Sequence, residues 1–271
     1  MPGILRRSLM DKIQNRKLQV GELKIHYVTG GEGEPLLIIH GGANGASAWR
    51  KNLAELAKHY TVYVPDLPGF GRSQEIEGDF HIPELVKFVD DFTRTLGLKT
   101  FYLVGHSLGG AIAVNYVLQF PHKITKLVLV SSMCLGKEIA LWVRFLSRLW
   151  LARIMGEALT GVFRLIKWAV EKLFDGFEFL MPFSRASIVL GIPLTTLKEQ
   201  TIVLANRLSD IMVPTLVVWG AKDRIVPPKQ AYDAGRLIPH CQVVVFDDCG
   251  HSVYREKLPE FSQLLTRFLD E

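Results

Sequence analysis

The chain of 271 residues is poor in cysteine and lacks any block of charge of one sign. Its three cysteines, Cys134, Cys241 and Cys249, form neither an even set for disulfides nor a CxxC pair. This usage excludes a disulfide framework and a structural zinc site, and it is typical of a reducing compartment. We therefore expect a cytoplasmic protein that binds no metal.

Charge and hydropathy exclude further classes of protein. The 32 Lys and Arg residues only slightly exceed the 27 Asp and Glu residues, giving a net charge of +5 without a polybasic stretch. We therefore expect no nucleic-acid partner. Residues 1–20 contain no apolar core of a signal peptide. In the most apolar region, residues 139–174, charged side chains interrupt every window of about 18 residues, so the sequence predicts no membrane-spanning helix.

Short apolar runs alternate with helix-period segments along most of the chain. The predicted strands are residues 23–28, 36–40, 61–64, 101–104, 126–130, 215–219 and 242–246. The predicted helices are residues 49–58, 83–96, 108–120, 230–237 and 259–269. The last three strands are continuously apolar, as strands covered on both faces require. This alternation predicts an α/β fold with a doubly wound, mostly parallel sheet.

One region interrupts the alternation. Residues 134–206 contain no strand run, and their arginines and leucines recur at helical spacing. We expect a helical lid here, inserted in an α/β core formed by residues 1–133 and 207–271. The lid is rich in large apolar rings such as Trp142, which favours an apolar acyl pocket. Its cationic face would allow transient contact with a membrane surface.

The segment FYLVGHSLGG, residues 101–110, carries the pattern G-x-S-x-G between a strand and a helix. In this context the pattern predicts a nucleophile elbow with Ser107 at a sharp turn. Gly105 and Gly109 suit this turn because the strand and the helix crowd each other there. We expect the Ser107 hydroxyl to lie above the carboxyl ends of the strands, at the N-terminus of the helix.

A serine hydroxyl needs a base to become a nucleophile, and the base needs an acid that holds it. His251 follows the last apolar strand on a loop and is the candidate base among the eight histidines. Asp223 follows the preceding strand, 28 residues before His251, and completes the order Ser, Asp, His. Asp247 and Asp248 compete for the acid role, but their closeness to His251 favours a part in shaping its loop.

Backbone amides are expected to bind the oxyanion of a tetrahedral intermediate. Leu108, directly after the serine, would supply one amide. The glycine-rich loop after the strand PLLIIH would supply the second, with Gly42 as the first choice and Ala43 as the second. His40 and His106 flank glycine turns, and we expect them to brace these loops by hydrogen bonding. This chemistry needs no organic cofactor.

These segments together resemble those of the α/β-hydrolase superfamily, from about residue 23 to the C-terminus. Besides the elbow, DLPGFGRS at residues 66–73 resembles the family loop D-x-P-G-x-G-x-S, while WGAKDRIVP and GHSVYREKLPEF resemble its acid and histidine segments. The resemblance implies a lidded serine esterase or a related carbon-carbon hydrolase, with Asp66 in a structural role. Serine in place of aspartate at position 107 argues against dehalogenase and epoxide hydrolase chemistry.

The sequence therefore predicts a serine hydrolase that cleaves small carboxylic esters with an apolar, short-to-medium acyl group. We expect Ala43, His106, Trp142 and Val226 to contact this substrate. A carbon-carbon bond hydrolase of aromatic ring-fission products is the second interpretation. In that branch tryptophan typically follows the histidine, whereas Ser252 does here. A ligand receptor that keeps the fold without turnover is the third, and the oligomeric state stays open.

Overall fold

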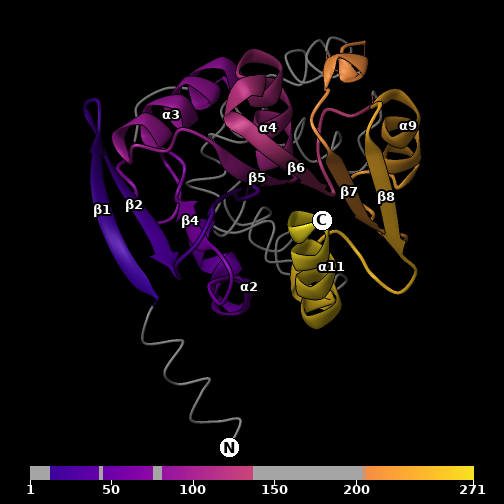
Figure 1. Ribbon diagram of the computed structural model, residues 1–271, viewed down its shortest axis with the longest axis horizontal. Coiled ribbons are helices and arrows are strands. Elements are labelled where there is room, and N and C mark those ends of the chain that lie inside the picture. The colour runs from indigo at the N-terminus through magenta and orange to yellow at the C-terminus, as the bar shows by residue number, and fades with distance from the viewer. Residues whose placement is uncertain (1–12, 43–44, 76–80, 137–203, 205) are drawn as a thin grey trace, which may run out of the picture.

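An eight-stranded sheet forms the centre of the protein in a computed structural model that describes residues 13–42, 45–75, 81–136, 204 and 206–271 (Figure 1). The strands are β1 (Gln14–Val20), β2 (Leu23–Gly30), β3 (Pro35–Ile39), β4 (Thr61–Pro65), β5 (Phe101–His106), β6 (Ile124–Val130), β7 (Thr215–Gly220) and β8 (Cys241–Phe246). Their order in the sheet is β1-β2-β4-β3-β5-β6-β7-β8. β2 pairs antiparallel with β1 and β4, and the other pairings are parallel. The predicted doubly wound, mostly parallel α/β fold is confirmed.

Helices cover both faces of the sheet. The α-helices are α2 (Arg50–Leu56), α3 (Ile82–Thr95), α4 (Leu108–Gln119), α9 (Lys229–Leu237), α10 (Val253–Glu256) and α11 (Leu258–Asp270). The 3-10 turns are η1 (Gly45–Trp49), η2 (Pro121–Lys123) and η5 (Leu208–Asp210). α3, α4 and α9 lie on one face, and α2 and α11 lie on the other (Figure 1). The core is therefore made of two apolar layers with the sheet between them.

The apolar residues of the strands divide between these two layers. Leu37 and Ile39 of β3 pack in the layer with α3, α4 and α9, while Leu36 and Ile38 pack in the layer with α2 and α11. Successive side chains of a strand point to opposite faces, so a continuously apolar strand is buried on both. β7, whose residues are all buried, meets this prediction.

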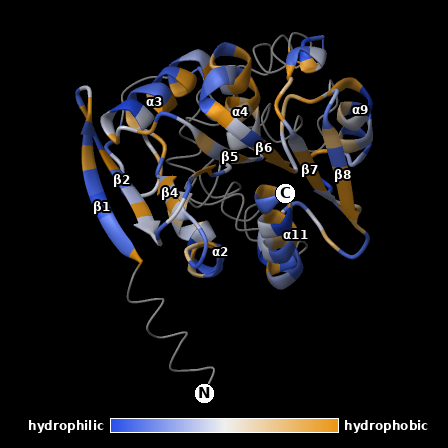
Figure 2. Ribbon diagram, in the orientation of Figure 1, coloured by the Kyte–Doolittle hydropathy of each residue, from blue (hydrophilic) through white to orange (hydrophobic). Residues whose placement is uncertain are grey.

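The two edge strands differ from the sequence prediction. β1 was not predicted, because its sequence QNRKLQV is mostly hydrophilic (Figure 2). It forms nonetheless because a tight turn at Gly21, with φ of 56°, pairs it with β2. β8 was expected to be covered on both faces, and its cover is partial: Val243 and Val245 pack against one core layer and Val244 and Phe246 against the other, but all four are only half-buried. β8 is the last strand of the sheet and has a neighbouring strand, β7, on one side only. Less of its surface is therefore buried than that of a central strand.

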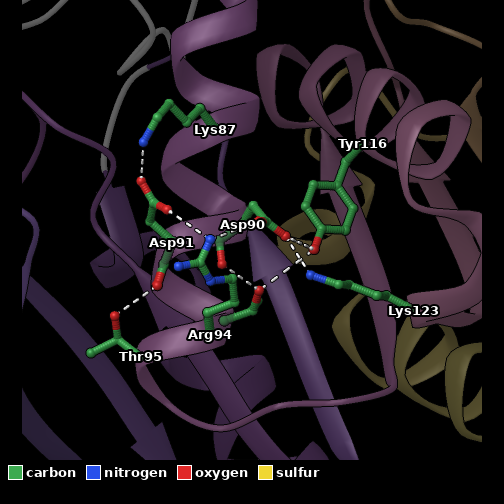
Figure 3. A network of polar contacts seen from close by, with 8 residues as sticks. Lys87, Asp90, Asp91, Arg94, Thr95, Tyr116 and Lys123 are labelled. Atoms are coloured by element: carbon green, nitrogen blue, oxygen red, sulfur yellow. Dashed lines mark hydrogen bonds and ion pairs between the residues drawn. The ribbon is translucent and has the colours of Figure 1, made fainter.

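A polar network joins α3 to the end of α4 (Figure 3). Asp90 of α3 accepts a hydrogen bond from the hydroxyl of Tyr116 on α4, at 3.2 Å, and forms an ion pair of 2.5 Å with Lys123 of η2. Lys87 and Asp91 form a second ion pair across one turn of α3. The contacts of Asp90 link α3 to α4 and η2 beside the start of β6, whereas the candidate residues lie at the carboxyl ends of β5 and β7.

The predicted lid, residues 134–206, lies outside the described residues except for 134–136, 204 and 206. The lid and the division of the chain into core and lid therefore stay predictions. Within the described part of the chain, no helix combines the length and the hydropathy needed to cross a bilayer.

Candidate active site

Ser107 lies at the turn between β5 and α4 with φ of 53° and ψ of −115°, a backbone conformation that is rare for residues other than glycine. The flanking glycines explain how such a turn fits. A Cβ atom at Gly105 would lie 2.4 Å from the Gly109 carbonyl oxygen, and one at Gly109 would lie 2.2 Å from the Ile39 carbonyl oxygen. The sharp strand-to-helix turn predicted from G-x-S-x-G is therefore present.

Backbone hydrogen bonds hold Ser107 in this strained conformation. Its amide donates to the Val130 carbonyl at 3.1 Å, and its own carbonyl accepts from Met133 and Gly110, each at 3.0 Å. The turn that follows β6 thus encloses the elbow, and Ser131 in that turn also has a positive φ, 43°. Because both sides of the elbow are bonded, the surrounding structure fixes the backbone at Ser107.

His251 and Asp223 form a hydrogen-bonded pair. His251 Nδ1 lies 2.8 Å from Asp223 Oδ2, and their side chains are only 9% and 0% exposed. The other carboxylate oxygen, Asp223 Oδ1, accepts hydrogen bonds from the amides of Ile225 at 2.8 Å and Val226 at 3.0 Å. An ionised Asp223 accepts the Nδ1 proton of His251, which makes Nε2 the basic nitrogen of the ring.

The loops that carry this pair approach each other at Gly220, the last residue of β7. A Cβ atom there would lie 2.1 Å from the Gly250 carbonyl oxygen and 2.3 Å from that of Cys249. The amide of Lys222 donates to the Cys249 carbonyl at 2.9 Å and so joins the two loops. Sequence reasoning missed Gly220, although a glycine directly between an apolar strand and a candidate acid was a signal for such an approach.

Asp248, one of the two competing carboxylates, points to solvent. It forms an exposed ion pair of 2.9 Å with Lys222. The hydrogen bond and the charge of Lys222 lower the pKa of the Asp248 carboxyl. Among Asp223, Asp247 and Asp248, the hydrogen bond to the His251 ring is made by Asp223.

His106 joins the elbow to the histidine loop. Its Nε2 lies 3.1 Å from the His251 carbonyl oxygen, so the ring donates this hydrogen bond, and the centroids of the two imidazoles are 4.9 Å apart. Burial, and then the neighbouring His251, holds the pKa of His106 well below the usual histidine value, so the ring is neutral. The predicted bracing hydrogen bond is present, whereas contact between His106 and substrate stays a prediction.

The glycine-rich loop after β3 is fixed at both ends by buried polar side chains. His40 Nδ1 donates to the Gly41 carbonyl at 2.6 Å, and its Nε2 accepts from the Leu67 amide at 3.0 Å. Burial lowers the pKa of His40, which is therefore neutral in this one tautomer. At the other end of the loop, Asp66 Oδ1 accepts from the Ala46 amide at 2.6 Å.

Asp66 also pairs with a histidine of the sheet. Its Oδ2 lies 2.7 Å from His26 Nδ1 and accepts from the Arg72 amide at 2.9 Å. A Cβ atom at Gly45 would lie 2.2 Å from Asp66 Oδ1, so this glycine lets the loop close on the carboxylate. These contacts agree with the structural role implied for Asp66.

The roles of the remaining predicted residues stay predictions, and the structure gives the positions of only some of them. Leu108 begins α4 directly after Ser107, and Gly42 is half-buried beside Gly41, whose own Cβ atom would lie 3.1 Å from Ser107 Cβ. Ala43 and Trp142 lie outside the described residues. Val226 is buried, and its carbonyl accepts a hydrogen bond from the Trp219 ring nitrogen at 3.1 Å. Among the described residues, no cluster of His, Cys, Asp and Glu is arranged to hold a metal ion.

The family model of the alpha/beta hydrolase fold matches residues 34–258, which is most of the chain and includes the elbow, the acid and the histidine. The chain belongs to the α/β-hydrolase fold family. The predicted resemblance is confirmed, and so is the coarse prediction of a hydrolase.

Three known proteins illustrate what this α/β-hydrolase is similar to. The chain is 28% identical to 2-hydroxy-6-oxo-6-phenylhexa-2,4-dienoate hydrolase of Comamonas testosteroni, over 97% of this chain and 96% of that one. It is similar to the crystal structure of a bacterial membrane phospholipase A, with a TM-score of 0.76 and 25% identity over 99% of this chain and 89% of that one. A thermophilic esterase from Thermogutta terrifontis, with a TM-score of 0.71, 23% identity and coverage of 95% and 98%, shares the fold.

Proposed function

We propose that the protein is a serine hydrolase that cleaves carboxylic esters with an apolar, short-to-medium acyl group. The observation that carries the proposal is the 2.8 Å contact between His251 Nδ1 and Asp223 Oδ2, on a loop that His106 bonds to the strained elbow of Ser107. The similarity to a structure described as a phospholipase A supports an ester as substrate.

In the proposed reaction, Ser107 Oγ attacks the ester carbonyl carbon while His251 Nε2 takes the hydroxyl proton. The bond between the carbonyl carbon and the alcohol oxygen then breaks, and the imidazolium gives its proton to the departing alcohol. Water attacks the resulting acyl-enzyme with the same imidazole as base, which releases the acid and restores Ser107. Asp223 stabilises the imidazolium, and the amides of Leu108 and Gly42 donate to the oxyanion.

A series of p-nitrophenyl esters graded by acyl length tests this proposal. We expect turnover by the unaltered protein and a loss of ~10⁴-fold or more in kcat for Ser107→Ala. Ser131→Ala is the matched control, because Ser131 is also buried, has a positive φ and directly follows the neighbouring strand β6. Turnover that survives Ser107→Ala would contradict the proposal.

A carbon-carbon bond hydrolase is the second candidate, favoured by the similarity to the dienoate hydrolase of C. testosteroni. Both reactions would use Ser107, His251 and Asp223. The same preparation can be assayed on a dienoate that is a vinylogous diketone and on the ester series. The two candidate functions are separated because the true substrate class has the higher kcat/KM. Tight ligand binding without turnover on either class would instead favour the receptor interpretation.

A further inference from the structure

The carboxylate of Glu256 binds backbone amides on both sides of His251. Glu256 Oε2 accepts a hydrogen bond from the Gly250 amide at 2.8 Å, and Oε1 accepts one from the Ser252 amide at 3.1 Å. The Cys249 thiol lies 3.6 Å from the same Oε2. Burial, and then Glu256, raises the pKa of Cys249 to about 12, so this thiol is protonated and able to donate. One exposed side chain thus accepts from three donors of the histidine loop, two before His251 and one after it.

These contacts go beyond ordinary capping of a helix. α10 begins at Val253, and a capping side chain would bond the amide of Ser252 at the N-cap position. The bond from Glu256 to the Gly250 amide lies before His251, outside the helix, and contributes nothing to the helical turn. The carboxylate therefore fixes the backbone that enters His251 as well as the backbone that leaves it.

The helical turn that presents Glu256 is itself anchored to the core. The side-chain amide of Asn52 donates to the Tyr254 carbonyl at 2.9 Å, and this Asn52 is buried. The Tyr254 ring stacks on Trp49 with centroids 4.0 Å apart and an angle of 7°. Glu256 is therefore supported by α2 and η1, so its carboxylate can hold the loop instead of moving with it.

We propose that Glu256 is a positioning residue that holds His251 in register with Asp223 and Ser107. This inference rests on the proposed function, in which His251 is the base. The His251 carbonyl is already held by His106, and the Glu256 carboxylate holds the two neighbouring amides. Without Glu256, both amides turn to water and the imidazole occupies its productive position for a smaller fraction of the time.

The test compares Glu256→Gln, Glu256→Ala and the control Glu260→Gln on the best ester substrate. Gln keeps one oxygen acceptor and Ala keeps none, so we expect kcat to fall about 10-fold for Gln and about 100-fold for Ala, with KM changed less than about 2-fold. The rate of Ser107 phosphonylation by a fluorophosphonate should fall by the same factors. Glu260 is an exposed carboxylate near the start of α11, and its variant should match the unaltered protein.

A second measurement does not depend on turnover. Amide hydrogen exchange at Gly250 and Ser252 should become at least about 10-fold faster in Glu256→Gln than in the unaltered protein, while exchange at Ser107 stays unchanged. Unchanged kcat in both Glu256 variants, or unchanged exchange at both amides, overturns the inference. Loss of the proposed function would be seen differently, as turnover that persists in Ser107→Ala.

Discussion

Two polar clusters of this molecule join segments that are far apart in the chain, and they do so in different ways. Between α3 and η2, Asp90 and Lys123 meet side chain to side chain (Figure 3). Around His251, the carboxylates of Asp223 and Glu256 and the ring of His106 bond to backbone groups of the loops. The first arrangement holds two helices together, whereas the second fixes the position of single atoms.

The difference extends to the glycines. At Gly105, Gly109 and Gly220 an added Cβ atom would lie within 2.5 Å of backbone carbonyl oxygens, so each marks a place where two segments of the site touch. At Gly97, near the end of α3, an added Cβ atom meets nothing within 4 Å. The backbone therefore leaves no room for a side chain at these three positions of the active site, whereas it leaves room at Gly97. Variants in the two regions should therefore fail in different ways.

The largest effect is expected from Asp223→Asn. Asn keeps an oxygen for the amides of Ile225 and Val226, but it turns an NH₂ group toward His251 Nδ1 and so favours the wrong tautomer. We expect kcat on the best ester to fall by ~10⁴-fold while the protein stays folded. Asp248→Asn is the control and should keep full activity, and a fully active Asp223→Asn would show that the imidazole needs no carboxylate.

The next largest effect is expected from Gly220→Ala. The added methyl group collides with the carbonyls of Cys249 and Gly250 and pushes the histidine loop away from Asp223. We expect a loss of about 100-fold in kcat and of about 1–3 kcal/mol in the free energy of unfolding. Gly97→Ala, with φ of 72° and open space, should cost stability alone. Equal activity of the two variants would remove the contrast between the regions.

A smaller effect is expected from the buried neutral histidines. Burial lowers the pKa of His40 and His106 in the folded protein, whereas in the unfolded chain each has a pKa of about 6.5. Their contribution to stability is complete above about pH 6.5 and is lost as the pH falls below it, because the unfolded state then binds more protons. The free energy of unfolding, measured in urea, should fall between about pH 7 and pH 5 in the unaltered protein, and it should fall less in His106→Gln. The control His122→Gln, at an exposed position, should show the same pH dependence as the unaltered protein. An equal pH dependence in the unaltered protein, His106→Gln and His122→Gln would refute the contribution assigned to His106.

The smallest effect is expected in the outer network. Lys123→Met removes the nearer ion-pair partner of Asp90, which keeps Arg94 at 3.8 Å and its hydrogen bond from Tyr116. We expect a loss of about 1 kcal/mol in the free energy of unfolding and unchanged kcat. Lys87→Met, which breaks a more exposed ion pair with Asp91, should cost less. A fall in kcat for Lys123→Met would show that the network reaches the active site.

Local patterns predicted much of this arrangement. The alternating apolar runs gave the parallel strands and their helices, and the turn chemistry around Ser107 gave the elbow. The strand β1 was not predicted, because its stability comes from pairing with β2 and not from its own residues. For a related reason, the sequence did not predict the contacts of Glu256 and Gly220 or the pairing of His26 with Asp66. Their contacts join separate segments of the chain, and only Gly220, which lies between an apolar strand and the candidate acid, left a signal of such an approach in the sequence.

The most direct test of the account is covalent labelling with a fluorophosphonate, followed by peptide mass spectrometry. The account predicts one label per chain, on Ser107, formed rapidly in the unaltered protein and at least about 10³-fold more slowly in His251→Gln. A label on another residue, or labelling of Ser107 at the same rate without the imidazole, would contradict the claim that His251 activates Ser107.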